Sequence, residues 1–122
     1  MQDILVTSNG RQANIRRADG VEIAAACGDN GQSLSSAELL AAALGSCVAA
    51  NLMPLFERHA LNPAALQIAL RPQSNGLEAG FNIQVRVPSC SADILTRLQR
   101  GAERCAVRQS LNIPVTFHWQ VD

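Results

Sequence analysis

One segment of this chain carries most of the information about its architecture. Residues 35–60 read SSAELLAAALGSCVAANLMPLFERHA. Ser35 or Ser36 offers a helix N-cap, and Glu38 lies in the first turn, where the helix dipole favours an acid. We therefore predict a helix over residues 36–60. Pro54 should kink it or split it in two, because proline removes one backbone hydrogen bond and collides with the preceding turn.

This predicted helix is apolar on nearly every side. Between Leu39 and Met53 only Gly45, Ser46 and Asn51 interrupt the apolar run. A helix without a polar face must be covered all round, and one small sheet covers only one side. A second helix or a second copy of the chain must cover the other side, so the pattern predicts an obligate homodimer.

Short strands are predicted ahead of the helix. Residues 1–26 contain three strand-like pieces separated by Asn9-Gly10 and Asp19-Gly20, which are strong hairpin turn signals. We expect a three-stranded meander over residues 1–26.

Residues 65–122 are predicted to hold a hairpin, a helix and a final strand. Apolar and polar residues alternate over 66–71 and again over 81–87, with Ser74-Asn75-Gly76 supplying the turn of an antiparallel hairpin. Ser91 then caps a helix, and Val115–Val121 forms the last strand. The buried stripe of that helix follows three-and-four spacing: Ile94, Leu95, Leu98, Ala102 and Cys105. The order βββ-α-ββ-α-β describes a single α+β domain over 1–122, with helices packed on antiparallel sheets.

Composition narrows the function. Ten basic and ten acidic residues give a formal net charge of +0, so no basic field exists to hold nucleic acid or an anionic membrane. All the basic residues are arginine and there is no tyrosine, which excludes a Schiff-base lysine and a tyrosine acid. The N-terminus does not resemble a signal peptide, and the apolar run over 39–50 is shorter than the roughly 20 residues that span a bilayer. We expect a cytoplasmic protein that does not enter a membrane.

Four cysteines, Cys27, Cys47, Cys90 and Cys105, are expected to be reduced thiols rather than a disulfide framework. No pair forms C-x-x-C, and the two histidines are not spaced as ligands, so we expect no zinc site. Cys27 and Cys90 have no activating neighbours and are interpreted as incidental.

Cys47 and Cys105 admit two interpretations. Each is either a small core residue or one member of a redox pair drawn from two helices. Cys47 is too far from the helix start to gain from the dipole, so a cation would have to hold its thiolate. Arg11, directly after the Asn9-Gly10 turn, is the first candidate, with Arg16 and Arg17 as alternatives.

Three motifs resemble the OsmC/Ohr family. The stretch from Ser36 to Cys47 is similar to the family's central helix, and the stretch from Ala102 to Val107 is similar to its second cysteine motif. The turn at Gly10-Arg11, followed by Asp19-Gly20, resembles its N-terminal hairpin. The likeness covers nearly the whole chain, with the motifs in the right order.

The resemblance implies an OsmC-like fold in an intertwined homodimer, with long central helices in the middle and the sites at the subunit interface. It also implies a thiol-dependent peroxidase acting on organic or hydrogen peroxide. By position in the motifs, Cys47 is the peroxidatic cysteine, Cys105 the resolving cysteine and Arg11 the residue that holds the thiolate. An external dithiol would reduce the resulting disulfide, without any cofactor.

Glu38 is the last residue of the candidate site, and whether it acts as the acid that partners Arg11 stays open. In the organic hydroperoxide branch an acid partners the arginine, but that position is Ala37 here, and Ala106 replaces the usual proline. Glu38 is the neighbouring acid, yet nine residues at 100° each place it on the opposite helix face from Cys47.

Two other functions stay open on the sequence alone. One is a non-catalytic module that binds a small hydrophobic ligand or a partner at the dimer interface. The other is thiol or hydrolytic chemistry at Cys47 with His59 or His118 as the base.

Overall fold

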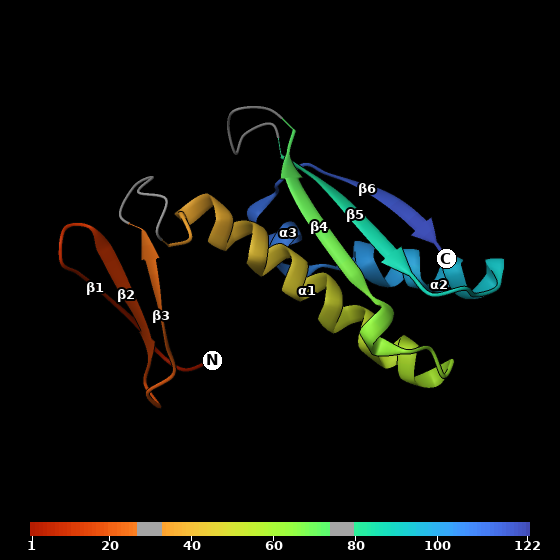
Figure 1. Cartoon of the computed structure of the whole chain (residues 1–122), viewed down its shortest axis with the longest axis horizontal. Helices are drawn as coiled ribbons and strands as arrows, with labels where there is room; N and C mark the ends of the chain where they lie inside the picture. Colours follow the sequence, from red (N-terminus) through yellow and green to blue (C-terminus); the bar gives the residue numbers. More distant parts are fainter. Residues whose placement is uncertain (27–32, 74–79) are drawn as a thin grey trace. The chain divides into compact units, whose positions relative to one another are not determined.

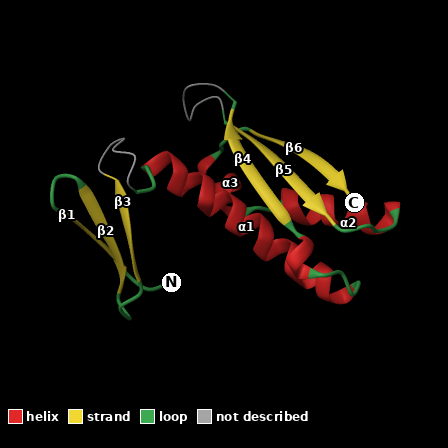
Figure 2. Cartoon of the chain, viewed as in Figure 1, coloured by secondary structure: helices red, strands yellow, loops and turns green. Residues whose placement is uncertain are grey.

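The computed structural model describes residues 1–26, 33–73 and 80–122 (Figures 1 and 2). The chain forms two compact units, Met1–Leu40 and Ala41–Asp122. Cys27 and the predicted turn at Ser74-Asn75-Gly76 lie outside the described residues.

The N-terminal unit contains the predicted meander. Strands β1 (Ile4–Ser8), β2 (Gln12–Arg17) and β3 (Glu22–Ala26) pair antiparallel in the order β1-β2-β3. Gly10 and Gly20 have φ angles of +95° and +101°, which is why glycine stands at both turns. Both predicted hairpins are confirmed.

Helix α1 (Ser36–Arg58) begins at a capping box. The Ser35 hydroxyl accepts the backbone N–H of Glu38 at 3.1 Å, and the Glu38 carboxylate accepts the backbone N–H of Ser35 at 2.9 Å. The helix continues through Pro54, so of the two predicted outcomes the split is wrong and the kink stays a prediction. Leu52 and Phe56 lie on either side of the proline, and each has at most 1 % of its surface exposed. Their burial anchors the helix turns before and after Pro54.

The C-terminal unit has a mixed sheet rather than the antiparallel one that we expected. Strands β4 (Gln67–Pro72) and β5 (Phe81–Val87) form the predicted antiparallel hairpin, but β6 (Val115–Val121) pairs with β5 in parallel. The chain crosses from β5 to β6 through helices, and a helical crossover of this kind joins parallel strands.

That crossover consists of two helices where one was predicted. Helix α2 (Ala92–Glu103) starts at Ser91, whose hydroxyl accepts the backbone N–H of Ile94 at 3.2 Å, as expected of the cap. It ends before Cys105, which has a non-helical ψ of 111° and is the N-cap of α3 (Ala106–Leu111). No glycine or proline stands at this break, and Cys105 still fits the three-and-four spacing of apolar residues. The sequence therefore predicted one continuous helix here. The observed order is βββ-α-ββ-αα-β, with a short 3₁₀ turn, η1 (Pro63–Ala65), before β4.

Within the C-terminal unit, α1 packs against both β4 and α2. A Cβ atom built on Gly45 would lie 2.9 Å from Leu70 Cδ1 in β4, and one built on Gly101 of α2 would lie 3.0 Å from Leu55 Cδ1. These two glycines therefore allow close approach on two sides of α1. The core contains the following buried side chains: Leu44, Val48, Leu52, Phe56, Phe81, Ile83, Val85, Val87, Leu98, Ala102 and Cys105.

Part of the α1 surface is exposed among the described residues. Ala42, Ala43 and Ala50 are exposed on this helix. At 23 residues α1 is long and apolar enough to cross a membrane by length and composition alone, a test that core helices of soluble proteins also pass. Its buried stripe against β4 and α2 is that of a core helix.

Candidate active site

The structure brings Cys47 and Cys105 together. Cys47 lies on α1 and is half-buried, and Cys105 lies at the α2–α3 junction with only 1 % of its surface exposed. The Cys105 side chain lies close enough to Cys47 to lower the pKa of the Cys47 thiol by hydrogen bonding. Both are free thiols, so the C-terminal unit places a potential nucleophile beside a potential resolving group.

Backbone N–H groups at the start of α3 stabilise a thiolate at Cys47. The N–H of Val107 has the largest effect and lowers the pKa of the Cys47 thiol, with smaller contributions from the Cys105 thiol and the N–H of Ala106. Partial burial acts in the opposite direction but does not prevail. N–H groups in the first turn of a helix have no partner within that helix, so they are available to an anion.

The backbone N–H donors of Ala106 and Val107 were not predicted from the sequence. A cation was expected to stabilise the Cys47 thiolate instead. These donors depend on the break at Cys105, because an uninterrupted helix would have bonded the N–H groups of Ala106 and Val107 to its own preceding turn. No side chain at the break signals it, since Ala106 is an ordinary helix residue. The family's proline at that position is the one signal that could have suggested a second helix start.

Cys105 has the opposite electrostatic environment. Burial, the largest cause, raises the pKa of its thiol, and the neighbouring Cys47 sulfur raises it further by hydrogen bonding and by charge. The backbone N–H groups of Arg108 and Val107 only partly offset this. Of the two thiols, Cys47 is therefore the one that loses its proton more readily.

Arg11 lies at the turn that opens β2, in the N-terminal unit. The backbone N–H of Arg11 donates to Asn9 Oδ1 at 3.0 Å, which helps to fix this turn. Its approach to Cys47 stays a prediction.

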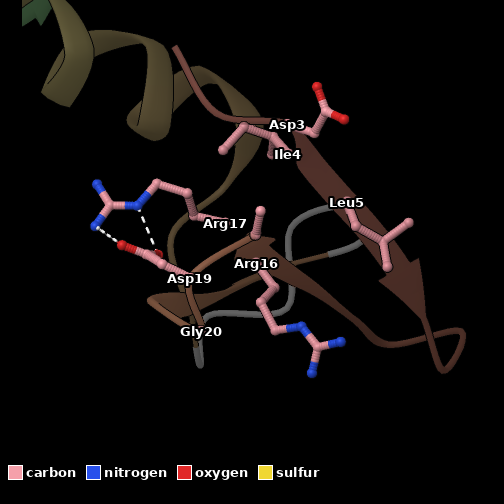
Figure 3. Close-up of a pocket in the computed structure, with 8 residues that line it drawn as sticks. Asp3, Ile4, Leu5, Arg16, Arg17, Asp19 and Gly20 are labelled. Atoms are coloured by element: carbon pink, nitrogen blue, oxygen red, sulfur yellow. Dashed lines mark hydrogen bonds and ion pairs between the residues drawn. The ribbon is translucent and has the colours of Figure 1, made fainter.

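Arg16 and Arg17, the alternatives, line a surface hollow of about 740 Å³ beside β1 and β2 (Figure 3). Arg17 binds both carboxylate oxygens of Asp19, at 2.8 and 2.6 Å, and this bond raises the pKa of the guanidinium while it lowers the pKa of Asp19. Because no cysteine lines this hollow, it lacks the chemistry of the Cys47 site.

Glu38 has a visible structural role. Its carboxylate accepts the backbone N–H of Ser35 in the capping box, and this bond, followed by one from the Ser35 hydroxyl, lowers the pKa of Glu38. A catalytic role for this exposed acid stays a prediction.

The remaining candidates lie elsewhere. His118 Nε2 is 3.2 Å from Asn82 Oδ1 on the sheet, and Cys90 directly precedes the α2 cap. The Nε2 atom of His59 is buried and has no hydrogen-bond partner within the described residues. Within the same residues, no three histidine, cysteine or acidic side chains gather as they would around a metal ion.

Comparison with solved structures identifies the fold. No family model and no curated protein matches this sequence. A hypothetical protein from Aquifex aeolicus VF5 is 16% identical, with 100% of this chain and 96% of that chain covered and a TM-score of 0.79. An OsmC-like protein from Mycoplasma pneumoniae is 11% identical, with 99% and 96% covered and a TM-score of 0.75. This chain has the OsmC/Ohr fold.

A hydroperoxide-resistance protein shares the same fold. OhrB of Bacillus subtilis is 16% identical, with 100% of this chain and 98% of that chain covered and a TM-score of 0.59. The OsmC-like fold that the resemblance implied is confirmed. Nearly all of this chain is covered in all three comparisons, so both compact units belong to the shared fold.

Proposed function

We propose that this OsmC/Ohr-fold protein is a thiol-dependent peroxidase that reduces organic hydroperoxides or hydrogen peroxide at Cys47. The observation that carries the proposal is the lowered pKa of the Cys47 thiol beside the buried Cys105, whose own thiol pKa is raised. A thiolate, not a thiol, is the nucleophile in such chemistry. The organic hydroperoxide resistance protein OhrB, which shares the fold, supports a peroxide-related role.

The first step oxidises Cys47. Its thiolate attacks one peroxide oxygen and the O–O bond breaks, so the sulfur is oxidised and the peroxide is reduced. The departing oxygen takes up a proton and leaves as an alcohol, or as water when the substrate is hydrogen peroxide. Cys47 becomes a sulfenic acid.

The second step resolves that intermediate. The Cys105 sulfur loses its proton and attacks the Cys47 sulfur, water leaves, and a disulfide forms. The proximity of the Cys105 side chain to Cys47 supports this step. An external dithiol then reduces the disulfide by exchange and is itself oxidised. Arg11 is proposed to orient the peroxide and add to the stabilisation of the thiolate, with Glu38 as a candidate partner.

A peroxide consumption assay tests the proposal. Purified protein with dithiothreitol should consume cumene hydroperoxide, and Cys47→Ser should lower the rate to that of dithiothreitol alone. Cys105→Ser should still react once and should accumulate a sulfenic acid that dimedone traps. Cys90→Ser is the matched control and should keep the wild-type rate. Equal consumption by wild type and Cys47→Ser would refute the peroxidase, and an apolar ligand retained in native mass spectrometry would then favour the binding module.

The proposed active form is a homodimer in the cytoplasm. The side chains of Ile4, Leu5 and Val6 on β1 are 49, 56 and 58 % exposed, and α1 adds exposed alanines. Exposed apolar surface of this extent favours burial against another chain. A second copy of the chain could cover both the apolar residues of β1 and the exposed alanines of α1. Sedimentation equilibrium should give twice the 13.0 kDa mass of the chain. A single-chain mass at micromolar concentration would exclude the dimer.

A further inference from the structure

An arginine-rich groove lies between α1 and α2. Its volume is about 420 Å³, and Leu55 and Gly101 contribute its apolar lining. The charged residues that line it are Arg58, Asp93, Arg97, Arg100 and Arg104. Four of the ten arginines of a chain with no net charge therefore converge on one groove that contains a single acid.

The groove is separate from the redox pair. Gly101 lies against Leu55, while Cys105, four residues further along the chain, lies against Cys47. Leu55 is eight residues beyond Cys47, which at 1.5 Å per residue is about 12 Å along α1. The groove thus occupies a different part of the same α1–α2 contact.

The arginines of the groove are poorly neutralised by the protein. Arg97 pairs with Asp93 only at 3.6 Å, whereas Arg17 and Arg86 bind their carboxylates at 2.6 and 2.7 Å. In the part of the chain that the structure describes, the side chains of Arg58, Arg100 and Arg104 form no hydrogen bond or ion pair. Like charges held in one groove repel one another, and an anion between them removes that repulsion.

Helix dipoles explain only part of this arrangement. Arg58 and Arg100 lie in the last turns of α1 and α2, where cations are favourable. The dipole does not select a helix face, however, so it does not account for both helices directing their arginines into the same groove. It also does not account for Arg97, which is further from the helix end.

We propose that this groove binds a small anion that carries at least two phosphate or carboxylate groups. Guanidinium groups match both chemistries through paired N–H donors, and a groove of this volume suits a small molecule. The site lies on one chain and goes beyond the proposed peroxidase, so it stands whether or not Cys47 reacts with peroxides.

Calorimetric titration of the purified full chain tests the site with pyrophosphate, inorganic phosphate and citrate as probes. Pyrophosphate or citrate should bind once per chain, more tightly than inorganic phosphate, and the affinity should fall as salt rises. Arg100→Gln should weaken binding about tenfold or more, since each paired contact to a charged group has an effect of that size. Arg71→Gln removes the same charge from β4 and should leave the affinity unchanged.

Arg97→Gln separates binding from helix stabilisation. It should weaken pyrophosphate binding without lowering the melting temperature, because it removes a cation that contributes little to the dipole. Tighter binding of pyrophosphate than of citrate would assign the site to phosphate groups, and the reverse order to carboxylates. Absence of binding by both probes at millimolar concentration, or equal weakening by Arg71→Gln, would overturn the proposal.

Discussion

The two compact units of this protein differ sharply in how they bury their apolar residues. In β5 every second residue is buried, from Phe81 to Val87, whereas all five residues of β1 are exposed. Because strands of both units are equally rich in apolar residues, composition does not explain the difference. The C-terminal unit folds around its own core, and the N-terminal sheet presents apolar surface that another surface must cover.

The difference has a consequence for the chemistry. The thiol pair and the backbone donors that lower the pKa of Cys47 lie entirely in the well-packed unit. The predicted cation, Arg11, lies on the exposed sheet. Nucleophile activation therefore relies on groups within one compact unit, while substrate orientation is expected to depend on assembly.

The largest expected effect is a loss of unfolding free energy, and it is tested by one substitution in each of the two units. Phe56→Ala empties a fully buried position and should cost about 3–5 kcal/mol of unfolding free energy. Leu5→Ala, on the exposed β1, should change it by no more than about 0.5 kcal/mol while weakening self-association. Urea denaturation and sedimentation measure the two quantities. Similar losses of stability for both variants would show that the N-terminal sheet has a core of its own.

Arg11→Gln tests whether the exposed unit contributes to catalysis. Loss of one guanidinium contact to the thiolate and peroxide should lower kcat/KM about 10–100-fold, because hydrogen bonds to charged groups are worth about 1.5–3 kcal/mol. Arg16→Gln, on the same sheet, is the matched control and should retain activity. Equal effects of the two substitutions would remove Arg11 from the site.

Much of the fold could be predicted because its signals are local. Asn9-Gly10, the Ser35 cap and the alternation over 81–87 each determine a turn, a helix start or a strand by short-range sterics and hydrogen bonding. The parallel direction of β6 could not be predicted, because it depends on how a crossover returns to the sheet. Pro54 is a local signal for a kink or a split, and the helix continues through it without a split.

The site was predicted less completely than the fold. Cys47 and Cys105 were proposed from the motifs, and the structure places them in contact. The donors from Ala106 and Val107 are backbone groups, identical in every residue, and only the path of the chain at Cys105 makes them available. Glu38 was selected for its charge, but its position three residues after Ser35 also fits a capping box.

Val107→Pro tests the backbone contribution within the packed unit. Proline is tolerated in the first turn of a helix but lacks the N–H that lowers the pKa of Cys47 most. The thiol pKa should rise, which lowers the thiolate fraction and with it the rate at neutral pH. In both proteins the rate should increase with pH as the thiolate forms, and the variant's curve should lie at higher pH. Iodoacetamide alkylation in a Cys27→Ser/Cys90→Ser background measures the curve.

Ala106→Pro is the graded control for that variant. It restores the residue that the family has at this position and removes the smaller of the two N–H contributions, so its pKa shift should be the smaller one. A larger shift in Ala106→Pro than in Val107→Pro would contradict the assignment of the donors.

Glu38→Gln has the smallest expected effect and separates the two roles of this residue. Glutamine can accept the Ser35 N–H and complete the capping box, so unfolding free energy should change by less than about 0.5 kcal/mol. Ser35→Ala, which removes the hydroxyl that caps α1, should cost about 1 kcal/mol. If Glu38 acts only as a cap, Glu38→Gln keeps its peroxidase rate within about twofold, since the carboxylate charge is then not used. A loss as large as that of Arg11→Gln, with stability unchanged, would instead make this carboxylate the partner of the arginine and link the start of α1 to the chemistry at Cys47.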